Sequence, residues 1–536
     1  MPARQALPVA ALGVFLIGGV ALALLVYFDL QTNLPFNDEW ARQWTIQRFL
    51  DGHGFALWGS NPGLVQLGAS LLLALAHTQP AVWRLGAVPF VALGGWASWK
   101  LAIRLGAAPF WSAVAAVVVP ASPLFLSVST GIMNETAFFG LYMAGIWLLV
   151  SATFDGGPYL LAAGMAFLAT IQRQQGAALL PGLVLALALI VATRKRALQW
   201  RDATGLLAMA VAVGLAWVIP QHLRPSSTLG VRPLATSSVW TGTLNGFTSL
   251  APFMLIPLAP GLLYLPKAQR RLSILQLVPL AIAGAGILAA WRPVLQGVGD
   301  LFPGNYLLGW TLGPPSLPGL YPMVVSFKPP IFPAPLFHGI EIAATATLVL
   351  LFAYRSLAWH PRHLGPIGVV LVFFAVVQLG AIVYYGGAVF DRFFLEVIPP
   401  LVPLVAAMAP AGARAYLAKA VTVLLLLAGL ALYAVGEQDY EAWQVARDQV
   451  ANLAYRHYPA YRVNAGFEET ARHVWIPATD NPGAHLERAL ARNPAVYIVW
   501  ALPGDPRVGV RYQSAAPGKV VLQVWPLGPE TYRVPQ

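Results

Sequence analysis

Apolar runs of about 17–20 residues recur along the sequence, and each is long enough to cross the roughly 30 Å hydrocarbon core of a bilayer as a helix. Hydrophobic residues make up 58% of the 536 residues and only 10% are charged, whereas soluble globular chains carry about 25% charged residues. Hydrocarbon offers no partners to free backbone amides, so helix is the expected conformation of every run. The sequence therefore predicts an α-helical polytopic membrane protein.

The net charge of +12 comes from basic residues in short loops between the apolar runs. Lys and Arg concentrate in the cytoplasmic loops of membrane proteins, so this charge indicates topology and predicts no nucleic-acid partner. The chain has no cysteine, which excludes disulfides, thiol catalysis and Cys-ligated zinc. Residues 7–27 are too long for a typical signal peptide and lack a clear cleavage site, so we expect an uncleaved first span.

Basic clusters orient the second half of the chain. If each cluster is cytoplasmic, the long loop at 292–336 and the tail from Glu437 lie outside. The loop is rich in Pro, Gly and aromatic residues and is too long for a simple connector, so it is a candidate substrate lid. The clusters lie at 194–201, 267–271, 355–363 and 414–419, and the expected spans are 205–221, 248–265, 273–291, 337–354, 365–385, 394–410 and 416–435.

The first half does not give a consistent count of spans. Arg4 places the N-terminus inside, so the first span ends outside and an odd number of crossings must lead to the cluster at 194–201. Six apolar runs lie between them, so one does not cross. We assign it to the first three, which are closely spaced and partly short, and expect about 13 spans in total. The six runs are 63–78, 83–101, 108–126, 136–153, 158–171 and 176–193.

The last hundred or so residues lack long apolar runs. We expect a transmembrane domain at 1–436 and a small soluble α/β domain at 437–536, outside the membrane. Hydrophobic periodicity predicts the elements of this second domain. The expected helices are 438–456 and 484–493, and the expected strands are 461–465, 495–501 and 519–525.

The first outer loop, NLPFNDEWARQWTIQRFLDGHGFALWGSNPG, carries the most informative polar residues. An asparagine N-cap would place Asp38 and Glu39 in the first turn of a helix that ends near residue 50. Trp40 and Trp44 are four residues apart and share one face, which predicts that this helix lies in the membrane interface. The acidic pair would then lie just outside the bilayer.

Asp38 and Glu39 have two interpretations. Both could simply stabilise the start of the helix through its macrodipole. Their position beside His53 and Trp58, at the level where a lipid-linked phosphate would lie, instead favours a catalytic pair with neighbouring substrate contacts.

Glu135, in SVSTGIMNETAFFG, is the second acidic candidate. It opens an apolar run with almost no other charge nearby, and a carboxylate at the head of a membrane helix is costly unless it is hydrated or paired. The alternative to catalysis is a helix-start residue behind an Asn134 cap.

Basic residues on the outer side run against the positive-inside bias and are therefore candidate phosphate ligands. We expect Arg173, Lys328 and Arg392 to contact a phosphate or pyrophosphate. Arg392 could instead form an ion pair with its neighbour Asp391 or Glu396.

Motifs for other chemistries are absent from the sequence. Its glycine-containing turns do not match a nucleotide-binding loop, and its nine histidines show no ligand spacing. Use of nucleotide sugars is therefore unsupported, and no cofactor is predicted; a divalent metal stays an open alternative that the sequence gives no reason to claim.

Several short motifs follow one another along the chain in an order that is typical of one superfamily. NDEWARQWTIQRFLDGHGF follows the first span, and NPGLVQLGASLLLAL with RLGAVPFVALGGW begins the next runs. An acidic site precedes a later span, and DRFFLEVIPPLVPL lies near the last spans. This order resembles the GT-C superfamily of membrane glycosyltransferases, and most of all its branch of protein O-mannosyltransferases and lipid A aminoarabinose transferases. The resemblance covers nearly the whole chain.

The resemblance implies a GT-C fold and roles for particular residues. The family's catalytic base falls on Asp38, with Glu39 beside it, and its second acidic residue falls on Glu135, where Asp is common. The family often begins the second run with Lys-Pro-Pro or His-Pro-Pro, whereas this chain has Ser-Asn-Pro-Gly at 60–63. One expected phosphate contact is therefore missing, and the outer arginines could replace it. The nearest branch needs no metal.

The resemblance implies a hexosyl- or pentosyltransferase in the bacterial inner (cell) membrane, and the residue types fit this chemistry. It would move a sugar from a polyprenyl-phosphate donor to an extracytoplasmic lipid, glycan or protein hydroxyl, with inversion. A transporter or flippase of lipid-linked saccharides is the alternative, although the chain has no repeated halves and its notable charges lie at the outer rim. A catalytically inactive partner subunit is a further alternative.

Overall fold

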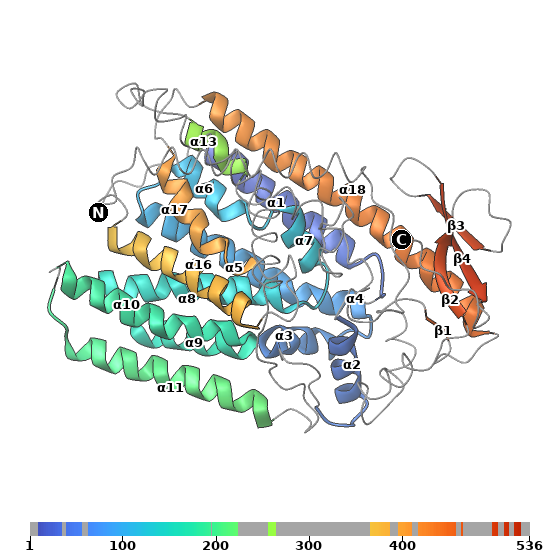
Figure 1. The fold of residues 1–536 in the computed structure, drawn as a ribbon, viewed down its shortest axis with the longest axis horizontal. Coiled ribbons are helices and arrows are strands. Elements are labelled where there is room, and N and C mark those ends of the chain that lie inside the picture. The colour runs from blue at the N-terminus through green and yellow to red at the C-terminus, as the bar shows by residue number, and fades with distance from the viewer. Residues whose placement is uncertain are drawn as a thin grey trace.

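The computed structural model of the chain describes residues 9–34, 39–55, 63–193, 196–222, 256–263, 365–385, 395–409, 416–456, 463–464, 496–501, 509–513 and 519–526. In these residues, apolar helices form one block, and a small β-sheet lies beside one end of the longest helix (Figure 1). The candidate lid at 292–336 and the predicted spans at 273–291 and 337–354 lie outside the described residues.

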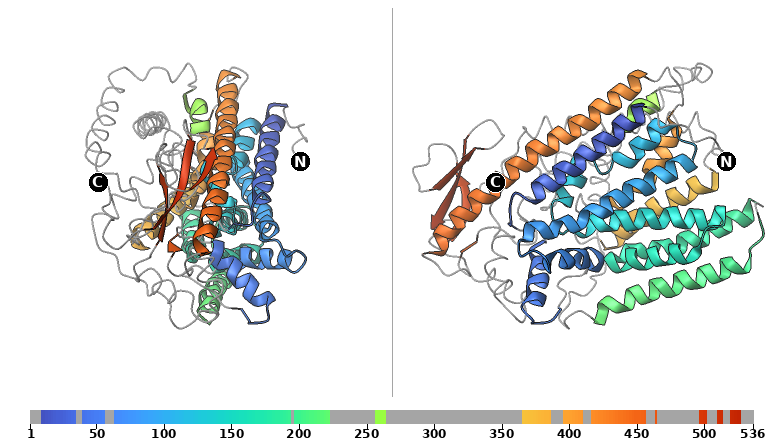
Figure 2. Two further views of the ribbon diagram at one scale, coloured as in Figure 1. Left: turned by 90° about the vertical axis from the view of Figure 1, so that its right-hand side faces the viewer. Right: turned by 180° about the vertical axis from the view of Figure 1, so that it is seen from behind.

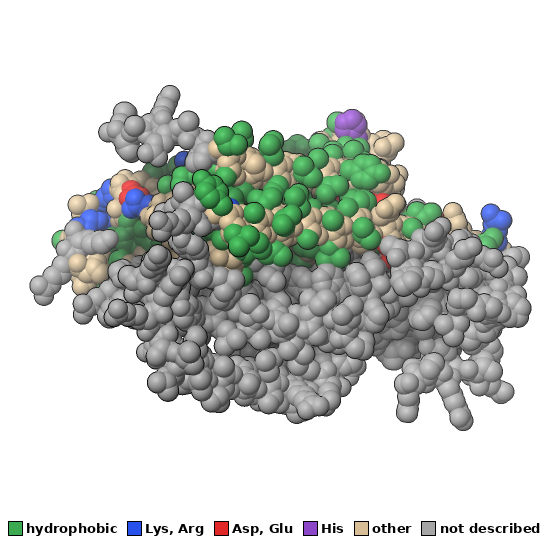
Figure 3. All heavy atoms as spheres, turned by 90° about the horizontal axis from the view of Figure 1, so that it is seen from above, with side chains coloured by type: hydrophobic (Ala, Val, Ile, Leu, Met, Phe, Trp, Pro, Cys, Tyr) green, Lys and Arg blue, Asp and Glu red, His purple; other side chains and the backbone are tan. Residues whose placement is uncertain are grey.

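Six helices of the described part are long and apolar enough to cross a membrane. Their outer faces are apolar: Leu417 is 78% exposed and Leu424 is 64% exposed, and hydrophobic side chains cover much of the described surface seen in Figure 3. Such a surface suits lipid, so the chain is a multi-pass membrane protein. The six are α1 (Val9–Asp29), α8 (Asn134–Asp155), the pair η2 (Gln174–Ala178) and α10 (Leu179–Ala192), α11 (Trp200–His222), α16 (Gly365–Tyr385) and α18 (Tyr416–Tyr455).

The early apolar runs form shorter helices. α3 (Leu64–Ala74) has 11 residues, or about 16 Å of helix, and is too short to cross the bilayer alone. The run at 108–126 is divided into α6 (Pro109–Val117) and α7 (Pro123–Ser129), each beginning at a proline. The total of about 13 spans therefore stays a prediction. The other described helices are α2 (Glu39–Leu50), α4 (Pro80–Trp83), η1 (Arg84–Ala87), α5 (Val88–Arg104), α9 (Tyr159–Gln172), η3 (Ile256–Leu258), α13 (Ala259–Leu263), η9 (Pro399–Leu401) and α17 (Val402–Met408).

Glycines let α5 and α8 pack closely inside the block. A Cβ atom on Gly140 of α8 would lie 2.3 Å from the carbonyl oxygen of Phe90 on α5. A Cβ atom on Gly94 of α5 would lie 2.2 Å from the ring of Phe139. Small residues allow membrane helices to approach, because lipid gives apolar side chains no hydrophobic reason to associate. The contact holds the first turns of α8 against α5.

A four-stranded sheet forms the described C-terminal part, with the order β1-β2-β4-β3. β1 (Val463–Asn464) is parallel to β2 (Val496–Ala501), whereas β4 (Lys519–Pro526) is antiparallel to β2 and to β3 (Gly509–Gln513). The sequence predicted strands at the positions of β1, β2 and β4 but missed the short β3. The helix predicted at 484–493 lies outside the described residues.

α18 joins the membrane block to the sheet. The predicted span at 416–435 and the predicted amphipathic helix at 438–456 form a single helix of 40 residues, about 60 Å long. Its apolar part ends at Val435, and its polar continuation packs against the sheet (Figure 2). The helix does not break at the expected boundary between residues 436 and 437, so the division into two domains stays a prediction.

Candidate active site

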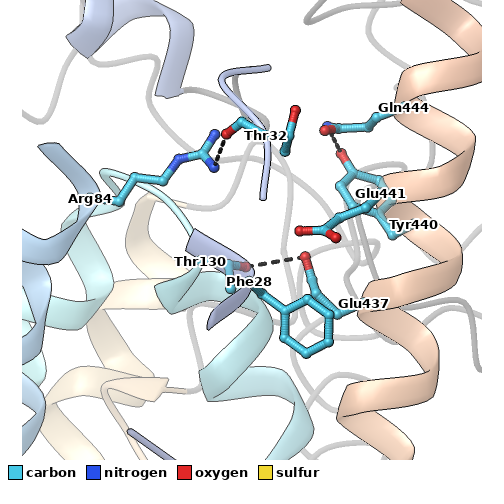
Figure 4. A pocket seen from close by; sticks show the side chains of 8 residues that line it. All are labelled: Phe28, Thr32, Arg84, Thr130, Glu437, Tyr440, Glu441 and Gln444. Atoms are coloured by element: carbon cyan, nitrogen blue, oxygen red, sulfur yellow. Dashed lines mark hydrogen bonds between the residues drawn. The ribbon is translucent and has the colours of Figure 1, made fainter. Parts of the chain in front are cut away.

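A pocket lies where α18 leaves the apolar block (Figure 4). Its cavity volume is about 10 Å³, which is close to the space that a single water molecule needs. One side comes from the ends of α1 and α7 and from η1, and the other comes from the polar part of α18. The lining residues are Phe28, Thr32, Arg84, Thr130, Glu437, Tyr440, Glu441 and Gln444.

The polar part of α18 brings two carboxylates to this pocket one helical turn apart. Glu437 is buried and accepts hydrogen bonds from the hydroxyls of Ser127 and Thr130, at 3.2 and 3.4 Å. Glu441 is half-buried and points toward Arg84 in Figure 4. It lies six residues, or about 9 Å, beyond the apolar part of the helix.

The protonation of Glu441 depends on its neighbours. Burial raises the pKa of its carboxyl from 4.5 to about 8, the charge of Glu437 raises it further, and Arg84 opposes the rise. A carboxyl with this pKa is mostly protonated at neutral pH, so Glu441 can donate a hydrogen bond.

Arg84 is the cation among the residues that line the pocket. Its guanidinium is buried and forms a bidentate ion pair with Glu39, with Nε to Oε1 at 2.8 Å and Nη2 to Oε2 at 2.9 Å. It also donates to the backbone carbonyls of Asp29 at 3.3 Å, Thr32 at 2.9 Å and Leu34. Arg has five N–H donors, so these five hydrogen bonds use them all.

Asp29 is a fourth acidic group close to Arg84. Its side chain is fully buried at the end of α1, and neither carboxylate oxygen has a hydrogen-bond partner among the described residues. Around Arg84 the described part of the chain therefore concentrates acidic groups, which makes this region suited to hydrogen-bond donors and cations.

A second charged cluster joins three segments at the same end of the block. Arg173, directly after α9, contacts Glu135 of α8 through Nη1 at 2.7 Å and Glu396 through Nε at 2.8 Å. All three side chains are at most 5% exposed. One guanidinium thus balances two buried carboxylates.

Hydrogen bonds extend this cluster toward α2 and α3. Arg42 of α2 donates to the side chain of Asn134 at 3.2 Å. Gln172 accepts from the backbone amides of Val65 and Gln66, both at 3.1 Å, and donates to the backbone carbonyl of Asn134 at 3.0 Å. The first turn of α8 is therefore bonded directly to α2 and α9, and through Gln172 to α3.

The described residues place several predicted site residues in buried ion pairs. Glu39 pairs with Arg84, whereas Glu135 and Arg173 pair with each other. His53 is exposed in the turn after α2. Asp38, Trp58, Lys328 and Arg392 lie outside the described residues.

Two local expectations are wrong. Trp40 and Trp44 are buried, at 0% and 6% exposure, and therefore pack inside the protein rather than in lipid. Asn134 does not cap α8: the N-cap position is Met133, and no side-chain cap hydrogen bond forms there. A spacing of four residues identifies a shared helix face but does not say whether protein or lipid covers it.

Four residues of this site were not predicted from the sequence: Arg84, Asp29, Glu437 and Glu441. Arg84 lies within the apolar run at 83–101, and an ionisable residue in such a run is itself a signal of function or of a buried partner. Both glutamates were assigned to the soluble domain at 437–536, and Glu441 to its predicted first helix at 438–456.

No family model matches the sequence, and no curated protein matches it. Among solved structures, the chain is similar to ArnT from Cupriavidus metallidurans in the apo state, with 14% identity and a TM-score of 0.34 over 96% of this chain and 98% of that one. It is also similar to the same protein bound to undecaprenyl phosphate, with 14% identity and a TM-score of 0.36 over 95% and 97% of the two chains. With TM-scores below 0.5, neither structure locates a residue or a ligand in this chain.

Proposed function

We propose that this chain is a membrane glycosyltransferase that moves a sugar from a polyprenyl-phosphate donor to a hydroxyl acceptor on the extracytoplasmic side. One observation carries the proposal. The pocket at the end of the apolar block contains carboxylates, and Glu39, the residue after Asp38, is fixed beside it by Arg84. Asp38 directly precedes Glu39 in the sequence, and we propose that it acts at this site.

In the proposed reaction, the oxygen of the acceptor hydroxyl attacks the anomeric carbon of the donor sugar. The bond between that carbon and the phosphate oxygen breaks, and polyprenyl phosphate leaves with the electron pair. Asp38 accepts the proton of the hydroxyl as general base. Lys328 and Arg392 are the proposed cations that stabilise the leaving phosphate. A single displacement of this kind inverts the anomeric centre.

We assign supporting roles to Glu39, Glu135 and Arg173. Each is buried in an ion pair at 2.7–2.8 Å, and an ion pair that is already desolvated holds its elements together. His53 and Trp58 stay proposed substrate contacts, because they follow Asp38 in the same loop.

The proposed location is the bacterial inner (cell) membrane, with the pocket and the C-terminal sheet on the outer side. This orientation follows from the basic clusters of the sequence. The partners are the lipid-linked donor, the hydroxyl acceptor and the bilayer. Among the described residues, no group of three His, Asp or Glu side chains could hold a metal ion, and no metal is included in the proposal.

Transfer from a synthetic donor tests the proposal. Purified protein in nanodiscs would receive a polyprenyl-phosphate sugar with a labelled sugar, together with an acceptor extract of cell-envelope lipids and glycans. We expect release of polyprenyl phosphate and transfer of the label. Asp38→Asn should lower the rate at least about a hundredfold, the usual scale for losing a general base, with unchanged thermal stability.

The same assay separates an enzyme from a transporter. A transporter or flippase would move the intact donor across a liposome membrane and leave its sugar–phosphate bond unbroken. An intact donor after incubation with the acceptor extract, or normal turnover in Asp38→Asn, would refute the proposed mechanism.

A further inference from the structure

Arg84 connects both sides of the short segment at 35–38. On the N-terminal side, its guanidinium binds the carbonyls of Asp29, Thr32 and Leu34. On the C-terminal side, it binds both carboxylate oxygens of Glu39. Four residues lie between Leu34 and Glu39, and Asp38 is one of them.

We propose that Arg84 is the positioning residue of the first outer loop: it fixes the two ends of the segment that carries Asp38. The inference rests on the proposed function, because it assigns Asp38 as the base. Arg84 itself does not contact the substrate in this proposal. Its five donors are already used, which leaves none for a phosphate.

Arginine suits this role better than lysine. The planar guanidinium presents five donors in a fixed fork, so it can hold one carboxylate and three carbonyls at once. An ammonium has three donors and no fork. A lysine would therefore keep the charge opposite Glu39 and lose at least two of the five contacts.

The surroundings of Arg84 make the arrangement rigid. The residue lies in η1 and its side chain is 3% exposed. Gly86, two residues further on, packs against α3: a Cβ atom there would lie 3.0 Å from the backbone nitrogen of Ser70. The guanidinium is therefore fixed to the helical block, and its hydrogen bonds fix Leu34 and Glu39 to the same block.

Two measurements test the proposal in full-length protein in nanodiscs. Hydrogen–deuterium exchange reports on the segment around residues 30–40 without any need for activity. Steady-state transfer gives kcat and the KM for the donor. The variant is Arg84→Lys, and the matched control is Arg104→Lys at the other end of α5, where Arg104 forms a half-exposed ion pair with Asp155.

For Arg84→Lys we expect faster exchange in the 30–40 segment and a kcat that is roughly ten- to a hundredfold lower, the scale of a misplaced catalytic group. The KM for the donor should change less than kcat, because no substrate contact is removed. Arg104→Lys should match the wild type in exchange and in kcat.

A charge-reversed variant separates positioning from simple charge balance. Glu39→Arg combined with Arg84→Glu restores an ion pair, but the new glutamate cannot donate to the three carbonyls. If this double variant folds and recovers wild-type kcat, or if Arg84→Lys has normal exchange or normal kcat, the proposal is wrong. If the wild type transfers no sugar while Arg84→Lys still exchanges faster, the proposed function fails, and Arg84 is a structural residue only.

Discussion

The three residues of the buried cluster, Arg173, Glu135 and Glu396, should differ in how much stability is lost when each is replaced. The three ionised side chains carry a formal charge of −1, from one guanidinium and two carboxylates, and all are at most 5% exposed. Removing the single cation leaves two buried carboxylates without a counter-charge among these three residues. We expect Arg173→Gln to lower the free energy of unfolding by about 3–5 kcal/mol, the cost of breaking a buried ion pair from one side.

Replacing one carboxylate should cost much less. Glu135→Gln keeps the side-chain length and an acceptor oxygen for Arg173, and Glu396 remains as the counter-charge. The formal charge of the cluster changes from −1 to 0. The expected loss is therefore about 1 kcal/mol, near the net value of one hydrogen bond. Glu396→Gln should behave in the same way.

Unfolding in SDS–detergent mixtures at constant lipid composition measures these differences. Arg104→Gln is the control, since its ion pair with Asp155 is more than one-third exposed and should contribute little. Equal stability of Arg173→Gln and Glu135→Gln would refute the reasoning, because the argument depends on the single cation. A stable Arg173→Gln with a raised KM for the donor would instead show that Arg173 binds the phosphate.

Three further predictions follow from other parts of the molecule. Gly140→Ala should cost about 1–3 kcal/mol through overpacking against α5, whereas Gly164→Ala, with nothing within 4 Å of the added carbon, should be neutral or slightly stabilising in the same unfolding assay. Because the folded-state pKa of Glu441 is raised above its ordinary 4.5 to about 8, wild-type stability should fall between about pH 5 and pH 8 relative to Glu441→Gln, measured by thermal unfolding across pH. In intact spheroplasts, an impermeant thiol reagent should label single cysteines introduced in the loop 292–336 and should not label Arg270→Cys.

The sequence predicts the local parts of this structure well. Residue hydropathy alone marks the long apolar helices, because lipid forces each run into helix. The helix after Asp38 ends at Leu50 as expected, and β2 and β4 coincide with their predicted strands within one residue. These features depend on neighbours within a few residues, which is the range that periodicity can detect.

The ion pairs could not be predicted in the same way. Arg84 and Glu39 are 45 positions apart, and Arg173 reaches Glu135 across 38 positions. A charged residue in a membrane segment predicts a buried partner, because an unpaired charge is costly there. Which residue is the partner depends on how the helices pack. For Glu396 the sequence offered its neighbour Arg392 as a partner, whereas the described contact is with Arg173.

α18 shows a different limit of the sequence. The change from apolar to polar residues at Glu437 marked the end of one element and the start of another. In the structure it marks only a change of environment, because no helix-breaking proline interrupts the 40 residues. The polarity of its residues indicates whether lipid, protein or water surrounds a helix. Whether the helix continues depends instead on helix-breaking residues such as proline and on capping residues.

The distribution of charge between the two ends of the helical block agrees with the proposed orientation. In the two described clusters at the pocket end, acidic groups outnumber the cations: Asp29, Glu39, Glu437 and Glu441 lie around Arg84, and two glutamates share Arg173. At the opposite end, the reverse holds: Arg196 and Arg201 share the single carboxylate of Asp202, at the start of α11.

Membrane proteins keep their excess of Lys and Arg on the cytoplasmic side, so the basic end should be inside and the pocket outside. The two ends thus differ in charge through contacts that the count of apolar runs did not include. A phosphate carried on a lipid would reach the acidic end only where a cation is still available to it. Since the donors of Arg84 are all used and Arg173 is shared by two carboxylates, Lys328 and Arg392 are the first residues at which to test donor binding.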